Sequence, residues 1–233
     1  MTDTPLWRPN EQALKNSPWM AFSDFAGKRA GRSLTDPLAL HEWSVTDREG
    51  FWSAIWDFCG ARGNKGERII ENANAMPGAR FFPDAELNFA ENLLSRTGAE
   101  PAMLFRAEDK VSRAMSWDQL HALVSQLQQA FRAHGVQKGD RIAAMMPNMP
   151  ESVACMLACA SIGAIWSSCS PDFGVKGVLD RFGQIEPKLF ISCDGYWYNG
   201  KRQDVTDKLV EIAASLKPKA TIIVPMLDDG EAV

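Results

Sequence analysis

The chain has 233 residues, a formal net charge of -4, and 45% hydrophobic residues. This length and apolar content suffice for one large domain, or for a domain with a long arm, and they argue against wholesale disorder. A slightly acidic chain without a Lys- and Arg-rich tract shows no feature of a nucleic-acid-binding protein or of one that binds an anionic membrane surface. The first ten residues lack an apolar signal core, and no apolar run approaches the length of a membrane span.

The five cysteines are odd in number and lack the spacing of a disulfide framework, so they predict reduced thiols in a cytoplasmic protein. Cys155 and Cys159 are four residues apart on a predicted helix. That helix is apolar, and no His or carboxylate is spaced as a metal partner. We therefore predict buried structural thiols and no metal site.

Residues 1–100 are irregular, with short helical pieces and many aromatic residues. Residues 47–58 predict an amphipathic helix, because Trp52, Ile55 and Trp56 recur at helical spacing. Thr46 and Glu49 at its start fit a capping box. A second short helix is predicted over residues 88–96.

From about residue 101 the pattern becomes regular. Residues 102–106 and 111–115 predict a β-hairpin, and Ser116 with Gln119 predicts the capping box of the helix that follows. Helices then alternate with short apolar strands, predicted at residues 141–146, 164–169, 188–192 and 220–224. This alternation predicts an α/β fold with a doubly wound, mostly parallel sheet covered by helices on both faces. Because no helix follows the last strand, we expect the sheet to be incomplete and the chain to be part of a longer protein.

The sharpest local motif is the stretch of residues 195–202, GYWYNGKR, which has the outline of a phosphate-binding P-loop. Arg202 stands where such a loop needs Ser or Thr, and the bulky Tyr-Trp-Tyr interior would not close on phosphates. Two interpretations remain open. The stretch is either an ordinary turn with solvated charges, or a surface loop in which Lys201 and Arg202 hold a phosphate.

A second candidate is the stretch of residues 166–173, WSSCSPDF, which follows a strand and precedes a helix, where α/β sheets place ligands. Its alternative is purely structural, because Ser170 or Asp172 would cap that helix. The three histidines lie far apart in the sequence. The chain has neither a G-x-S-x-G nor a G-x-G-x-x-G motif, so no catalytic residue is predicted.

The segment of residues 116–224 resembles the first α/β subdomain of the adenylate-forming acyl-CoA synthetases. The stretches HGVQKGDRIAAMMPNMPE, ACMLACASIGAIWSS and VLDRFGQIEPKLFIS carry this likeness. Before them, FWSAIWDF and GARFFPDAELNFAENLL are similar to the N-terminal region of acetyl-CoA-synthetase-type enzymes. Three further segments resemble, more narrowly, the branch of the family that uses acetoacetate: PLWRPNEQALKNSPWMAFSDF, WSSCSPDFG and DGYWYNGK. The resemblance implies an N-terminal region over residues 1–100 and an incomplete first α/β subdomain over residues 101–233.

The family joins an acid to CoA in two steps, through an acyl-adenylate made from ATP with Mg²⁺. The resemblance implies acetoacetate, ATP and CoA as substrates of the intact enzyme, while the phosphate loop and the catalytic lysine would lie in later segments. We therefore expect this chain alone to be inactive. What carries over is one edge of the CoA site, aligned with Tyr198, Asn199, Gly200, Lys201, Asp172 and Phe173. The chain departs from acetyl-CoA synthetases here, because Pro171-Asp172 replaces paired glycines and Tyr198 replaces an arginine.

Two further expectations follow. The rival function is a stand-alone, non-catalytic module that binds CoA or another protein. An incomplete sheet would also expose an apolar face or edge, so we expect self-association.

Overall fold

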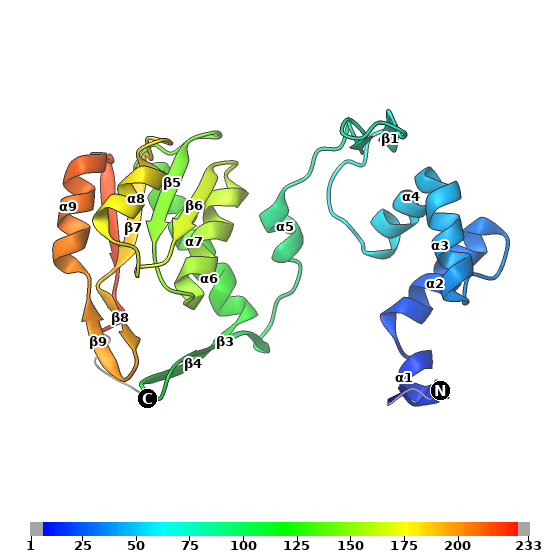
Figure 1. The fold of residues 1–233 in the computed structure, drawn as a ribbon, viewed down its shortest axis with the longest axis horizontal. Coiled ribbons are helices and arrows are strands. Elements are labelled where there is room, and N and C mark those ends of the chain that lie inside the picture. Colours follow the sequence, from blue (N-terminus) through cyan, green and yellow to red (C-terminus); the bar gives the residue numbers. More distant parts are fainter. Residues whose placement is uncertain (1–6, 228–233) are drawn as a thin grey trace, which may run out of the picture. The chain divides into compact units, whose positions relative to one another are not determined.

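The computed structural model describes residues 7–227, and the chain divides into two compact units, Met1–Leu87 and Asn88–Val233 (Figure 1). Each unit has its own buried cluster of hydrophobic residues. No helix among the described residues is long and apolar enough to cross a membrane.

The first unit is built from short helices and one small antiparallel strand pair. Its elements are α1 (Glu11–Lys15), α2 (Pro18–Ala30), α3 (Pro37–Thr46), α4 (Arg48–Phe58), β1 (Ile70–Glu71) and β2 (Arg80–Phe81). The core of the helical part consists of Phe22, Ala26, Leu34, Leu40, Trp43 and Ala54. The region predicted as irregular therefore has a packed helical core.

The helix predicted over residues 47–58 is confirmed as α4, but its predicted cap is wrong. Asp47 ends α3 and is also the N-cap of α4, where its carboxylate accepts a hydrogen bond from the Gly50 N–H at 3.0 Å. Thr46 is still helical, and its hydroxyl donates to the Glu42 carbonyl at 2.7 Å. A residue in a helical conformation cannot act as an N-cap. The Thr46–Glu49 capping box therefore does not form.

The second unit contains a four-stranded sheet and two separate hairpins. Its helices are α5 (Phe89–Leu93), α6 (Trp117–Ala133), α7 (Pro150–Ser161), α8 (Val175–Phe182) and α9 (Thr206–Leu216). The sheet is formed by β5 (Arg141–Met145), β6 (Ile165–Cys169), β7 (Leu189–Cys193) and β10 (Ala220–Val224). The hairpins pair β3 (Pro101–Ala107) with β4 (Val111–Ser116), and β8 (Gly195–Tyr198) with β9 (Lys201–Asp204).

The sheet has the strand order β10-β7-β5-β6, and every neighbouring pair is parallel. Helix α6 packs on α7 and α8 on α9, so helices cover both faces of the sheet (Figure 1). All five residues of β7 are buried, as expected for a central parallel strand. The predicted α/β class and parallel sheet are confirmed.

The hairpin β8–β9 is a correction to the sequence-based interpretation of residues 195–202 as a loop. Its strands pair from Gly195↔Asp204 to Tyr198↔Lys201. The turn residues Asn199 and Gly200 have φ of 51° and 70°, both left-handed, as a two-residue hairpin turn requires. The stretch is therefore a strand–turn–strand unit and not a P-loop, which would lead from a strand into a helix.

Candidate functional site

A hollow of the second unit lies at the carboxyl ends of the parallel strands, where α/β sheets bind ligands. After β5 the chain passes through α7 to β6 at one edge, whereas the strands after β6 lie on the other side of β5. The connections that leave β5 and β7 therefore run in opposite directions along the sheet. Open α/β sheets bind ligands in the crevice that forms between two such strands, at their carboxyl ends. A hollow of about 330 Å³ occupies this end of the sheet.

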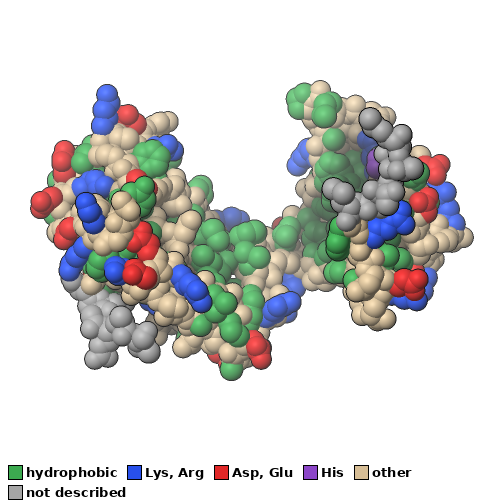
Figure 2. Space-filling view, turned by 60° about the horizontal axis from the view of Figure 1, so that its bottom comes forward, with side chains coloured by type: hydrophobic (Ala, Val, Ile, Leu, Met, Phe, Trp, Pro, Cys, Tyr) green, Lys and Arg blue, Asp and Glu red, His purple; other side chains and the backbone are tan. Residues whose placement is uncertain are grey.

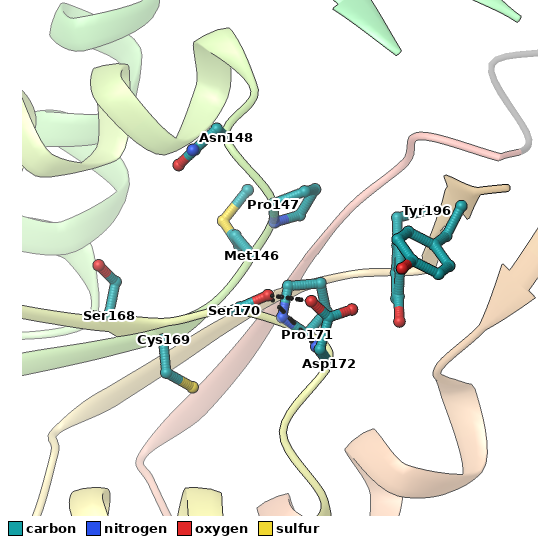
Figure 3. A pocket seen from close by; sticks show the side chains of 10 residues that line it. Met146, Pro147, Asn148, Ser168, Cys169, Ser170, Pro171, Asp172 and Tyr196 are labelled. Atoms are coloured by element: carbon teal, nitrogen blue, oxygen red, sulfur yellow. Dashed lines mark hydrogen bonds between the residues drawn. The ribbon is translucent and has the colours of Figure 1, made fainter. Parts of the chain in front are cut away.

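Three segments line the hollow (Figure 3): the residues after β5, the end of β6 with the loop that follows it, and β8. The lining residues are Met146, Pro147, Asn148, Ser168, Cys169, Ser170, Pro171, Asp172, Tyr196 and Tyr198. Backbone, hydroxyl, amide and carboxyl groups all reach the same space, so the hollow suits a polar ligand that is bound by hydrogen bonds.

The loop after β6 is held in place by a lysine from α9. The Lys208 ammonium donates to the carbonyl oxygens of Pro171 and Phe173, the latter at 3.1 Å. Within the loop, the Ser170 hydroxyl donates to the Asp172 carboxylate at 3.0 Å (Figure 3). Charge-assisted bonds of this kind are stronger than neutral ones, so the loop has a defined shape.

The expectation that Ser170 or Asp172 caps α8 is wrong. The N-cap of α8 is Gly174, and no side chain bonds to the first turn. Ser170 and Asp172 bond to each other instead. Their side chains are thereby committed to shaping the loop that lines the hollow.

Tyr196 faces Asp172 across the hollow (Figure 3). Burial, together with a hydrogen bond to Asp172, raises the pKa of Tyr196 to about 12. The phenol therefore stays protonated at neutral pH and acts as a donor, not as a base. Phe173, next in the loop, lies under the Arg181 guanidinium, whose central carbon is 4.3 Å from the ring centroid.

The six residues predicted to form the CoA edge divide into two groups. Asp172 and Tyr198 line the hollow, and Phe173 follows directly in the same loop. Asn199, Gly200 and Lys201 lie at the tip of the β8–β9 hairpin, next to Tyr198. The fold thus brings residues 172 and 198 to one hollow, although 25 residues separate them in the sequence.

Four of the five cysteines are buried, and burial disfavours their reactive thiolate form. Cys169 lines the hollow, and burial raises its pKa. Burial also raises the pKa of Cys155 and of Cys159 to about 12, and that of Cys193 to about 11. The buried thiols predicted at Cys155 and Cys159 are confirmed. Within residues 7–227 no group of His, Cys, Asp and Glu side chains could hold a metal ion.

Several residues around the hollow were missed from the sequence. Met146 ends the strand predicted over residues 141–146, and Pro147 and Asn148 follow it, so the switch-point rule would have found them once the strand order was known. Tyr196 would have followed from reading the Asn-Gly pair as a hairpin turn. Lys208 carries no local signal, because it acts through loop carbonyls 35 and 37 residues away.

Comparison with known proteins agrees with this architecture. A family described as "AMP-binding enzyme" matches residues 90–232, and one described as "Acetyl-coenzyme A synthetase N-terminus" matches residues 38–93. A solved structure of the acetoacetyl-CoA synthetase from Streptomyces lividans superposes with a TM-score of 0.88 at 36% identity. The superposition covers 99% of this chain and 36% of the Streptomyces lividans chain.

Curated relatives give the same result. The acetoacetyl-coenzyme A synthetase of Rhizobium meliloti is 58% identical over 231 residues, which cover 99% of this chain and 35% of the relative. The malonamoyl-CoA synthetase vrtB of Penicillium aethiopicum is 36% identical over 94% of this chain and 31% of its own length. This chain thus spans about a third of the length of these relatives, and it belongs to the AMP-binding enzyme family.

Proposed function

We propose that the chain is the N-terminal part of an ATP-dependent ligase that converts acetoacetate and CoA to acetoacetyl-CoA through an acyl-adenylate. The observation that carries this proposal is the 58% identity, across almost the whole chain, to a relative named acetoacetyl-coenzyme A synthetase. Residues 1–100 would be its N-terminal region, and residues 101–233 the first part of its α/β domain. Five free cysteines support a cytoplasmic setting.

The described residues do not fit a site for the ATP polyphosphate or for its Mg²⁺. The only P-loop outline is a hairpin, and the described part of the chain has no cluster of carboxylates that could hold a metal. We therefore assign the adenylation chemistry to residues outside this chain. The chain alone should show no acetoacetate-dependent ATP–pyrophosphate exchange.

A chimera tests the proposed place of this chain in the enzyme. The chain would replace the matching third of the Rhizobium meliloti relative, to which it is 58% identical. We expect the chimera to show acetoacetate-dependent ATP–pyrophosphate exchange and the separate chain to show none. A folded chimera without exchange, or exchange by the separate chain, would contradict the proposal.

We assign one edge of the CoA site to Tyr198, Asn199, Gly200, Lys201, Asp172 and Phe173. Tyr198 and Asp172 line the same hollow, and the exposed Lys201 is next to it on the hairpin. An exposed ammonium contributes modestly to binding a phosphate, and its contribution falls as the salt concentration rises. Lys201 would therefore distinguish CoA from dephospho-CoA, which lacks the 3′-phosphate.

Calorimetry with both ligands tests this assignment. The variant Lys201→Ala should lower the ratio of CoA affinity to dephospho-CoA affinity by about three- to tenfold at low salt. The matched control is Lys138→Ala, which removes an exposed lysine at the opposite end of the sheet. An unchanged ratio in Lys201→Ala, or an equal drop in the control, would remove Lys201 from the site.

We also propose that the separate chain self-associates. Both edge strands of the sheet carry an exposed isoleucine: Ile165 on β6 is 52% exposed and Ile223 on β10 is 54% exposed. Hydrophobic side chains are also visible on the surface in Figure 2. Apolar edge strands are templates for pairing with another chain. Sedimentation should show oligomers that dissociate in Ile165→Lys/Ile223→Lys, and a monomeric parent chain at high concentration would refute the proposal.

A further inference from the structure

The tip of the β8–β9 hairpin is bound by a carboxylate from a distant part of the chain. The N–H groups of Asn199 and Gly200 donate to the two carboxylate oxygens of Glu108, at 2.6 Å and 2.7 Å. Glu108 lies in the turn between β3 and β4, 91 residues before Asn199. Each oxygen accepts one charge-assisted bond, so this contact fixes both the position and the orientation of the turn.

The backbone of Glu108 indicates that its side chain matters. Its φ is 53°, in the left-handed region that Gly, Asn and Asp tolerate better than a longer side chain does. A glycine would adopt this turn with less strain. A strained backbone persists where the surrounding contacts hold it in place. At Glu108 the two hydrogen bonds of the carboxylate are such contacts.

The same two hairpins are linked a second time. The Lys110 ammonium, two residues after Glu108, lies 6.0 Å from the centroid of the Trp197 ring on β8. This distance is at the outer limit of a cation–π contact. The β3–β4 turn thus reaches the tip of the other hairpin through Glu108 and its body through Lys110.

We propose that Glu108 is a positioning residue, which holds the Asn199–Gly200 turn so that Lys201 is presented for the 3′-phosphate of CoA. This inference rests on the CoA role proposed for Lys201. Because Glu108 occupies both turn N–H groups, these groups are not open to a phosphate, and recognition of the phosphate is left to side chains such as that of Lys201. A carboxylate near the site would by itself repel a phosphate. If Glu108 raises the affinity for CoA, it therefore does so by fixing the position of the turn and not by its charge.

The contact is tested first without any ligand. In Glu108→Gln and Glu108→Gly, the amide resonances of Asn199 and Gly200 should shift and their hydrogen exchange should become faster. Glu108→Gly also removes the backbone strain, so a loss of folding would not explain its effect. The control Glu186→Gln changes another exposed glutamate with a left-handed backbone, at φ 46°, in the loop before β7, and it should leave both amides unchanged. Amides that do not respond in either Glu108 variant would show that the contact does not hold the turn, and would overturn the proposal.

The positioning role is tested next through selectivity between CoA and dephospho-CoA. A positioning residue cannot contribute more than the group it places, so Glu108→Gln should lower the affinity ratio by about two- to fivefold, less than Lys201→Ala. In a Lys201→Ala background, Glu108→Gln should cause no further drop, because Lys201 is the group it acts through. The control Glu186→Gln should leave the ratio unchanged.

The outcomes separate the inference from the proposed function. If Lys201→Ala lowers the ratio but Glu108→Gln does not, or if the two effects simply add, only the positioning role fails. If Glu108→Gln increases CoA affinity, the carboxylate opposes the phosphate and the inference is wrong. If Lys201→Ala itself leaves the ratio unchanged, the CoA role of this turn fails first, and the role of Glu108 in it fails as a consequence.

Discussion

The four-stranded sheet and the segments that line the hollow at its end are held by different forces. The strands are continuous apolar runs, and all five residues of β7 are buried. The lining segments are fixed by ionised side chains from far along the chain, Lys208 on one loop and Glu108 on the hairpin tip. The comparison shows that burial stabilises the scaffold, whereas a few charged contacts shape the site.

Truncating the centre of the sheet should have the largest effect on stability. Phe190 in β7 is fully buried, and its ring packs against Phe182 of α8 with centroids 6.1 Å apart. Phe190→Ala should lower the free energy of unfolding by about 3–5 kcal/mol, because it removes apolar burial and leaves a cavity. Denaturant unfolding measures this loss.

The edge of the same sheet supplies the control. Ile223→Ala on β10 truncates a side chain that is 54% exposed, and it should cost less than about 1 kcal/mol. Equal losses at the centre and at the edge would show that burial in this sheet does not decide its stability.

Removing the tether of the loop after β6 should have a smaller effect. Lys208→Met keeps much of the stem but leaves the carbonyls of Pro171 and Phe173 without their ammonium donor. Because each carbonyl loses a hydrogen-bond donor, we expect a loss of about 1–2 kcal/mol. Hydrogen exchange should become faster across residues 170–174 and remain unchanged in β7. The control is Lys176→Met on the exposed side of α8, and exchange that rises equally in both variants would contradict a specific tether.

The contrast between sheet and lining segments also explains what the sequence could and could not predict. The strands of the four-stranded sheet and the helices of the second unit could be predicted because their apolar periodicity is local, and Ser116 with Gln119 forms the predicted capping box. Tyr198 and Asp172 came from likeness to a family, and the structure places both at the hollow. Glu108 and Lys208 could not be found, because no local pattern indicates which backbone groups a distant charge will reach.

The family resemblance also assigned the tip of the β8–β9 hairpin to the CoA site, but it did not indicate which residues contact that tip. The resemblance assigns Gly200 to one edge of the CoA site, but the structure shows that its N–H donates to Glu108. This bond depends on the packing of two hairpins whose turns are 91 residues apart. Contacts of this kind emerge only when the elements are assembled.

The smallest effect is expected from a surface ion pair at the opposite end of the sheet. Asp140, just before β5, accepts hydrogen bonds from Lys188 at 2.6 Å and from the Gln137 N–H at 2.7 Å. The bond from Lys188, followed by that from Gln137, lowers the pKa of Asp140 in the folded chain below its usual value of 3.8. The folded state therefore favours the ionised carboxylate more than the unfolded state does.

The sign of the pH dependence follows from that difference. The contribution of Asp140 is fully present above the unfolded pKa of about 4, and it is lost as the pH falls through the lower folded pKa. Asp140→Asn should cost less than about 1 kcal/mol at neutral pH, because a partly exposed pair contributes little. The difference in unfolding free energy between the parent chain and Asp140→Asn should become smaller below about pH 4. The control Asp180→Asn should show no such decrease, and a difference that stays constant down to pH 2 would mean that the Lys188 bond does not couple the charge of Asp140 to folding.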